Sequence, residues 1–142
     1  MFVFFNTIYA TNEYMINTSD KHLNSAIQHE LGHKHYFPFM FIMFILLVLT
    51  ISITFLLIPI SIFILLPFSY LMFCYLCRIG EYMADVYALE KTSMEGMIEL
   101  LIDEGKRLDT PLSNWFYLLR FHPNSEKRIK RLKGKSIPPI SD

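Results

Sequence analysis

Two histidines and a glutamate near the start of the chain have the residue types and the spacing for metal chemistry. His29, Glu30 and His33 form the pattern His-Glu-x-x-His. On a helix, residues four apart lie on one face, so both imidazoles can reach the same ion. Zinc favours imidazole ligands, and the glutamate between them can accept a proton from a water on the metal. The pattern predicts a zinc site, with a chance match on a polar helix face as the alternative.

A catalytic zinc usually has three protein ligands, so a third ligand must come from elsewhere in the chain. Glu81 and Asp85 are the candidates, because they lie one turn apart on one face of a predicted helix. Two like charges at that spacing destabilise a helix unless a cation faces them. One zinc ion per chain, held by the two histidines, would supply that cation. The alternative is that both acids are solvated and pair loosely with nearby basic residues.

The histidine pattern must be held on a helix, and the surrounding sequence predicts one over residues 20–36. Thr18, Ser19 and Asp20 offer N-cap chemistry, and apolar residues then recur at four-residue steps. Pro38 disfavours the helical conformation at the preceding residue, so we expect the helix to end or kink there. Gly32, in mid-helix, costs about 1 kcal/mol relative to alanine, which suggests that another backbone approaches closely at this point.

The two halves of this site are separated by an apolar run that is long enough to cross a membrane twice. Residues 37–77 contain no Asp, Glu, Lys, Arg or His, and 53% of the whole chain is hydrophobic. A membrane-spanning helix needs about 20 apolar residues. We therefore predict helices over 39–58 and 60–77, broken at Pro59, with a kink at Pro67. A single long helix bent at Pro59 is the competing interpretation.

Two crossings return His33 and Glu81 to the same side of the membrane, whereas one crossing would separate them. Basic residues flank the run at Lys34 and Arg78, and more of them gather over 127–135. Because Lys and Arg favour the cytoplasmic side, we expect an integral membrane protein with two crossings whose site faces the cytoplasm. The basic residues over 127–135 favour contact with anionic lipid headgroups, or else belong to a solvated helix.

The remaining predicted elements are short. β-branched and aromatic residues over 3–11 suggest one strand. We expect helices over 78–91 and 93–108 and a turn over 109–112. A last helix is expected over 123–132, because a proline suits the first helical turn.

The predicted fold is mainly α and divides into three parts. These are a short strand with the metal-binding helix (1–36), a transmembrane hairpin (37–77), and a C-terminal helical part with a basic tail (78–142). The 13 basic and 13 acidic residues cancel, and no aromatic residues interleave with the basic tail, so no nucleic-acid partner is expected. Cys74 and Cys77 lie in the apolar run, where packing is a better explanation than redox or metal chemistry.

In combination, these motifs resemble the HtpX-type membrane zinc metallopeptidases and, more distantly, the CAAX prenyl proteases. The resemblance rests on the His-Glu-x-x-His pattern, the apolar hairpin, segment 81–85, the pair His122–Pro123, and Arg128 with Ile129. It implies zincin-like metallopeptidase helices, with a strand over 8–11 ahead of the metal-binding helix. Members of this family normally have membrane segments and a substrate-binding edge strand before that helix. Only 28 residues precede His29, the first histidine of the motif, so a substrate would have fewer backbone partners.

The resemblance also implies a role for each matching residue. Glu81 matches the third zinc ligand, and Asp85 matches an aspartate that braces a ligand histidine. Glu30 is expected to be the general base. His122 matches a position that could stabilise the oxyanion, or it could simply cap the last helix.

The leading hypothesis is a membrane-embedded zinc endopeptidase that hydrolyses peptide bonds of membrane or misfolded proteins, with the lipid bilayer and a membrane-associated polypeptide as partners. One alternative is a zinc-binding but weakly active relative that works as a binding or regulatory module. Another is a small structural membrane protein whose motif arose by chance. His22 and His35 are expected to take no part in metal binding.

Overall fold

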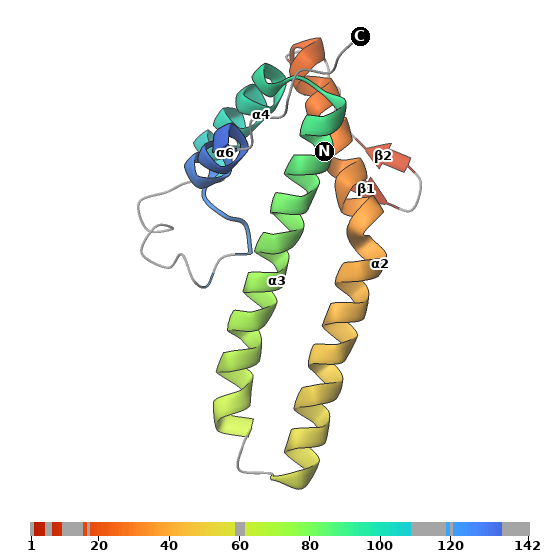
Figure 1. Cartoon of the computed structure of the whole chain (residues 1–142), viewed down its shortest axis with the longest axis vertical. Helices are drawn as coiled ribbons and strands as arrows, with labels where there is room; N and C mark the ends of the chain where they lie inside the picture. The colour runs from red at the N-terminus through yellow and green to blue at the C-terminus, as the bar shows by residue number, and fades with distance from the viewer. Residues whose placement is uncertain are drawn as a thin grey trace.

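The computed structural model describes residues 2–4, 7–9, 16, 18–58, 62–108, 119 and 121–134. Its elements are β1 (Phe2–Phe4), β2 (Thr7–Tyr9), α2 (Asp20–Leu57), α3 (Ile62–Lys91), α4 (Met94–Leu108) and α6 (Ser125–Gly134). The fold is mainly α, as predicted. Helices α2 and α3 form a long hairpin, and α4 and α6 pack at the end opposite its tip (Figure 1). The turn expected over 109–112 lies outside the described residues.

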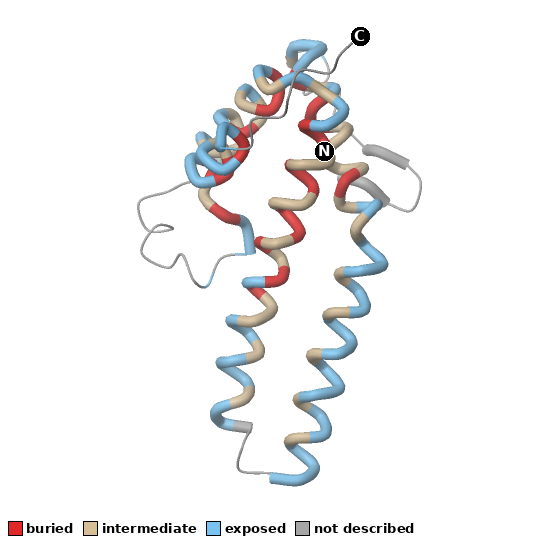
Figure 2. The backbone as a smooth tube through the Cα atoms, viewed as in Figure 1, coloured by how far each residue is buried: buried red, intermediate tan, exposed pale blue. Residues whose placement is uncertain are grey.

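The hairpin confirms that the apolar run forms two helices that lie side by side rather than one bent helix. Both helices are long and apolar enough to cross a membrane. The most apolar window of α2 contains no buried residue, and only 22% of the corresponding window of α3 is buried. Figure 2 shows this contrast, with exposed residues along the hairpin and buried ones near α4 and α6. The apolar side chains of the hairpin therefore face outward.

Both long helices run through positions where the sequence predicted a boundary. Pro38 lies inside α2, and the expected boundary between helices 60–77 and 78–91 lies inside α3. The prediction of separate helices was wrong at both places. A change from apolar to polar side chains leaves the backbone hydrogen bonds unchanged. A proline removes only one donor, which a long helix can tolerate where its neighbours compensate.

The N-terminal segment forms a two-stranded antiparallel sheet instead of the single strand predicted over 3–11. Strand β1 pairs with β2 in the register Phe2↔Tyr9, Val3↔Ile8 and Phe4↔Thr7. The two strands are separated by only two residues in the sequence, which is the commonest hairpin spacing. A lone strand would leave its backbone groups without partners, and the pairing satisfies some of them. Strand β1 contacts α2, so the sheet lies beside this helix (Figure 1).

The small core lies where the end of α3 meets α4 and α6. It is formed by one cluster of buried apolar side chains: Ala88, Leu89, Met97, Leu101 and Leu132. Helix α4 also packs closely on the start of α2, because a Cβ added at Gly96 would lie 2.7 Å from the carbonyl oxygen of Lys21. This packing anchors the first turns of α2 against the rest of the domain.

The caps of the helices follow local sequence rules with one shift. Ser19 caps α2 as predicted, since its hydroxyl accepts a hydrogen bond from the backbone N–H of His22 at 3.2 Å. The last helix begins at Ser125 rather than Pro123. Asn124 caps it instead, and its side-chain oxygen accepts from the backbone N–H of Glu126 at 2.8 Å.

Candidate metal centre

Helices α2 and α3 approach most closely at a glycine. A Cβ added at Gly32 would lie 2.8 Å from the Cα of Ala84 and 3.0 Å from its carbonyl oxygen. This confirms the prediction that the mid-helix glycine permits close contact with another backbone. The contact places the turn of α2 that carries His29 and His33 against the turn of α3 that carries Glu81.

The three predicted ligand residues converge at this contact. Nε2 of His29 lies 3.1 Å from Nε2 of His33 and 3.4 Å from Oε2 of Glu81. Nε2 of His33 lies 3.5 Å from Oε1 of Glu81. Ligand atoms about 2.0–2.1 Å from a tetrahedral zinc lie about 3.3 Å from one another, so these separations fit one ion. The donor set of two imidazoles and one carboxylate also suits zinc.

The other face of His29 meets Asp85. Its Nδ1 atom is buried without a hydrogen bond of good geometry, 3.1 Å from Oδ1 of Asp85. Nδ1 of the ring faces Asp85, and Nε2 faces Glu81 and His33. A metal-ligating histidine has this orientation when a carboxylate holds its second ring nitrogen. Glu81 and Asp85 are 5% and 1% exposed, so the alternative of two solvated acids is wrong.

Arg128 belongs to this site rather than to a solvated or lipid-facing basic tail. Its side chain is 0% exposed, so the expectation for the basic residues over 127–135 is wrong at this position. Nε and Nη2 donate to the two carboxylate oxygens of Asp85 at 2.8 and 2.6 Å. Nη1 donates to Glu104 at 2.7 Å, and Nη2 lies 3.3 Å from Glu81. One guanidinium thus pairs with two buried acids and a partly buried one, and offsets part of their negative charge.

A signal for this burial was present in the sequence. Ser125, Arg128 and Leu132 are the buried residues of α6, and they recur at the three- and four-residue steps of one helix face. The arginine therefore sits on the apolar face of its helix. Glu104, its partner on α4, was not singled out by any motif.

His122 lies beside the ligand set. Its Nδ1 is 2.8 Å from Oε1 of Glu81, and its side chain is half exposed. The interpretation of His122 as the cap of the last helix does not hold, because Asn124 occupies that position. Glu81, Glu104 and His122 also form a second group of metal-type side chains whose ligand atoms lie within 4.8 Å of one another.

The acids and the buried arginine shift the pKa values of both histidines. Burial lowers the pKa of His29, but the carboxylates of Asp85 and Glu81 outweigh it and raise the pKa to about 9. Burial lowers the pKa of His33 to about 4, with a further contribution from the charge of His29. The two imidazoles therefore differ, because the acids raise the pKa of His29 whereas burial lowers that of His33.

The carboxylates differ from one another in the same field. Burial alone would raise the pKa of Glu81, but hydrogen bonds with His122 and His29 hold it well below its usual range. Burial would also raise the pKa of Asp85. Its hydrogen bonds with the guanidinium of Arg128 outweigh burial, so the pKa of Asp85 is lowered. Glu30 is different, because burial raises its pKa and no strong partner reverses the shift. A carboxylate with a raised pKa suits proton transfer.

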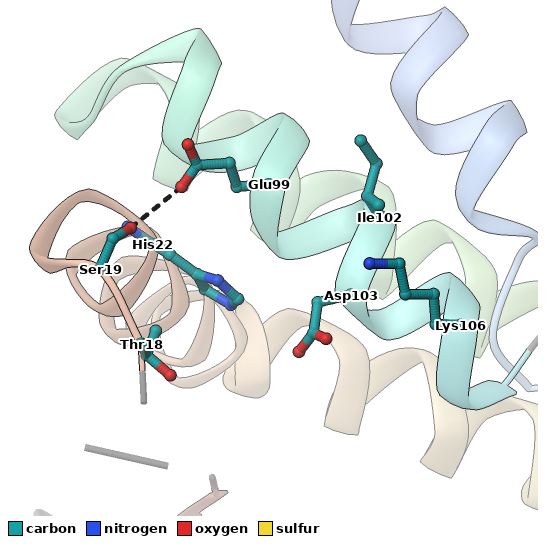
Figure 3. Close-up of a pocket in the computed structure, with 7 residues that line it drawn as sticks. All are labelled: Thr18, Ser19, His22, Glu99, Ile102, Asp103 and Lys106. Carbon is teal, nitrogen blue, oxygen red and sulfur yellow. Dashed lines mark hydrogen bonds between the residues drawn. The ribbon is translucent and has the colours of Figure 1, made fainter. Parts of the chain in front are cut away.

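The other histidines lie away from the three converging residues. His35 stacks on Tyr87, with ring centroids 5.2 Å apart. His22 lines a separate cavity of about 370 Å³ between the start of α2 and α4 (Figure 3). The cavity is lined by Thr18, Ser19, His22, Glu99, Ile102, Asp103 and Lys106. In Figure 3 the hydroxyl of Ser19 meets the carboxylate of Glu99, at 3.0 Å.

The comparisons with known proteins give one match. The family model described as "Peptidase family M48" matches residues 2–136, which is nearly the whole chain. No curated protein and no solved structure matches the chain.

Proposed function

The chain belongs to peptidase family M48, a metallopeptidase family, and on this premise we propose that it is a zinc-dependent endopeptidase of the HtpX type embedded in a membrane. His29, His33 and Glu81 are the proposed ligands of a single zinc ion. The observation that carries the proposal is the spacing of their ligand atoms at 3.1, 3.4 and 3.5 Å. His29 and His33 lie one turn apart on α2, and Glu81 comes from α3, so two helices bring the three groups together at the separation that zinc ligands require.

When bound, zinc would acidify a water molecule and polarise the substrate carbonyl. Residues of the chain would transfer the proton and stabilise the negative charge that develops on the substrate. Glu30 would accept the proton of the attacking water and return it to the leaving amine, a task that its raised pKa favours. His122 would donate a hydrogen bond toward the oxygen that becomes negative in the transition state.

Asp85 and Arg128 would position the ligands rather than touch the substrate. Asp85 faces Nδ1 of His29 at 3.1 Å and so orients its Nε2 toward the metal. Arg128 holds both oxygens of Asp85 and reaches Glu81 at 3.3 Å. The guanidinium therefore fixes one ligand directly and a second one through an intermediate carboxylate.

The N-terminal sheet is the element that would supply backbone partners for a substrate, and the expectation that such partners are few stays a prediction. Strands β1 and β2 pair with each other along one edge, and β1 contacts α2. In a two-stranded sheet each strand has a second edge, to which an extended peptide can add as a further strand. We propose that a substrate peptide uses one of these edges.

The membrane assignment rests on the exposed apolar half of the hairpin. We propose that α2 and α3 each cross the bilayer once, and that the site faces the cytoplasm because basic residues flank the apolar run. A hydrolytic site within one helical turn of the bilayer suits substrates that are membrane proteins or their misfolded segments. The substrate would be a polypeptide, as the family implies.

Zinc analysis and a proteolysis assay test the proposal together. The purified wild-type protein is expected to contain one zinc per chain, and a His29→Ala/His33→Ala variant none. Glu30→Gln is expected to keep the zinc, but its kcat is expected to fall by about 10²–10⁴-fold, the usual contribution of a general acid-base group. Wild-type protein without stoichiometric zinc would refute the site.

The same experiment distinguishes a catalyst from a zinc-binding module. If the zinc-loaded wild-type protein and Glu30→Gln cleave unfolded membrane-protein substrates equally slowly, the protein binds zinc without working as an efficient peptidase. A large difference between them establishes hydrolysis at this site.

A further inference from the structure

Two described residues between α4 and α6, Leu119 and Phe121, contact the apolar half of α3. The hydroxyl of Tyr70 donates a hydrogen bond to the carbonyl oxygen of Leu119 at 3.1 Å. The ring of Phe121 lies 6.0 Å from that of Tyr70 and 5.7 Å from that of Phe73, in edge-to-face contacts. These contacts attach Leu119 and Phe121 to a part of α3 that is closer to the hairpin tip than the core formed with α4 and α6.

The depth of this contact follows from the geometry of α3. Arg78 is the first charged residue after the apolar run. Tyr70 precedes it by eight residues and Phe73 by five, so they lie about 12 Å and about 7 Å further along the helix, at 1.5 Å per residue. Glu81 follows Arg78 by three residues, so it lies about one helical turn beyond Arg78, in the direction away from the apolar run. If α3 spans a bilayer, the contacts of Phe121 fall inside the hydrocarbon while the metal centre stays in water.

The exposed surface of Leu119 and Phe121 fits that environment. Leu119 is 44% exposed and Phe121 is 42% exposed, although both are apolar. Tyr70, which contacts both of them, is exposed too, so the apolar surface of the hairpin continues onto Leu119 and Phe121. The sequence over 115–119 reads Trp-Phe-Tyr-Leu-Leu, which has the aromatic composition of a membrane interface.

We infer that the segment around Leu119 and Phe121 inserts into the bilayer beside α3 and anchors the metal centre at the membrane surface. This inference rests on the proposed function, because it requires α3 to cross the membrane. The partner is the lipid itself, with the side chains of Leu119 and Phe121 in the hydrocarbon.

The anchor has a consequence for the choice of substrate. Phe121 is followed directly by His122, whose Nδ1 lies 2.8 Å from a carboxylate oxygen of Glu81. If Phe121 is inserted, the next residue, His122, lies at the membrane surface, and so does the side of the site to which His122 belongs. The site would select peptide bonds only a few residues from a membrane-spanning helix over bonds in long soluble loops.

Single-tryptophan variants in brominated lipid test the inference on the full chain. Trp115→Phe removes the native tryptophan, and Phe121→Trp or Leu119→Trp then adds a probe at each position. Leu49→Trp, on the exposed apolar face of α2, is the lipid control, and Glu126→Trp, exposed on α6, is the water control. Each variant is placed in vesicles of phosphatidylcholine and phosphatidylglycerol with brominated acyl chains, and each is also exposed to iodide in the water phase.

The probes at 121 and 119 are expected to lose fluorescence in brominated lipid as Leu49→Trp does, and to resist iodide. If they behave like Glu126→Trp while Leu49→Trp is quenched by the lipid, the anchor does not exist, although the helices still span the membrane. If Leu49→Trp is also quenched only by iodide, the membrane part of the proposed function fails and this inference fails with it. Two probe positions guard against a local disturbance at either one.

Discussion

The two ends of the α2–α3 hairpin reverse the usual relation between polarity and burial. At the end near α4, the buried side chains include His29, Glu81, Asp85 and Arg128. Toward the tip, Leu49, Leu56, Phe63 and other large apolar side chains are exposed. Figure 2 shows both ends on the same pair of helices.

Each end is stabilised by what surrounds it. Buried charges are tolerated where opposite charges and hydrogen bonds compensate their desolvation, and a fully buried guanidinium among three carboxylates meets that condition. Exposed apolar residues are tolerated where the surrounding medium is itself apolar. The same helix can therefore have a charged, buried end in water and an apolar, exposed end in lipid. Substitutions that add or remove a charge are expected to affect these two ends differently.

The largest expected effect is at the polar end. Arg128→Met would leave the buried Asp85 and the partly buried Glu104 without their cation. We expect the free energy of unfolding to fall by about 3–5 kcal/mol, as when one partner of a buried ion pair is removed. Denaturant unfolding in detergent measures the loss.

Lys130 provides the matched control, because it is exposed on the same helix. Lys130→Met is expected to change the free energy of unfolding by no more than about 0.5 kcal/mol. Equal effects of the two substitutions would contradict the assignment of Arg128 to the centre of the charge network.

The next effect concerns the apolar end. Leu49 is half exposed on α2, where a lysine would be harmless in water. In a bilayer, Leu49→Lys is expected to cost about 2.5–3.5 kcal/mol, because a charge would lie near the middle of the membrane. The fraction of newly made protein that resists extraction from membranes by alkaline carbonate measures this cost. Asn24→Lys, exposed at the polar end of the same helix, is expected to leave that fraction unchanged. Equal membrane integration of the two variants would argue against a membrane-spanning α2.

The smallest effect concerns the point where the two ends meet. Gly32→Ala places a methyl group 2.8 Å from the Cα of Ala84, so the helices must separate. We expect a loss of stability of about 1–3 kcal/mol, typical of overpacking, together with weaker zinc binding. Competition with a chromogenic zinc chelator measures the affinity.

Gly80→Ala is the control for this substitution, because its Cβ would meet only the end of the Met40 side chain, at 3.4 Å. The thioether can move, so zinc affinity is expected to stay unchanged. If Gly32→Ala binds zinc as tightly as Gly80→Ala does, the close contact is not what positions the ligands.

Much of this architecture could be predicted from local patterns. The cap at Ser19, the apolar run and the helix over 93–108 follow from the spacing of residue types, and the structure confirms them within a residue or so. The pattern at His29 and His33 also needed only the pitch of a helix. Their joint role with Glu81 in binding zinc stays a prediction, although the structure brings the three residues together.

Other features depended on contacts that no local pattern contains. The continuation of α2 past Pro38 reflects the balance between one lost hydrogen bond and the stability of a long helix. The pairing of β1 with β2 replaced the single strand, because strands need partners. Arg128 looked like one more residue of a basic tail until α6 packed its face against α3 and α4.

The sequence by itself determined which segments are helical, which are apolar, and which side chains share a face, since each of these depends on neighbours within a turn or two. Only the tertiary structure decided which charges are buried together. Desolvation and ion pairing depend on distances between residues remote in the chain, such as Arg128 and Asp85, and those distances exist only once the helices have packed.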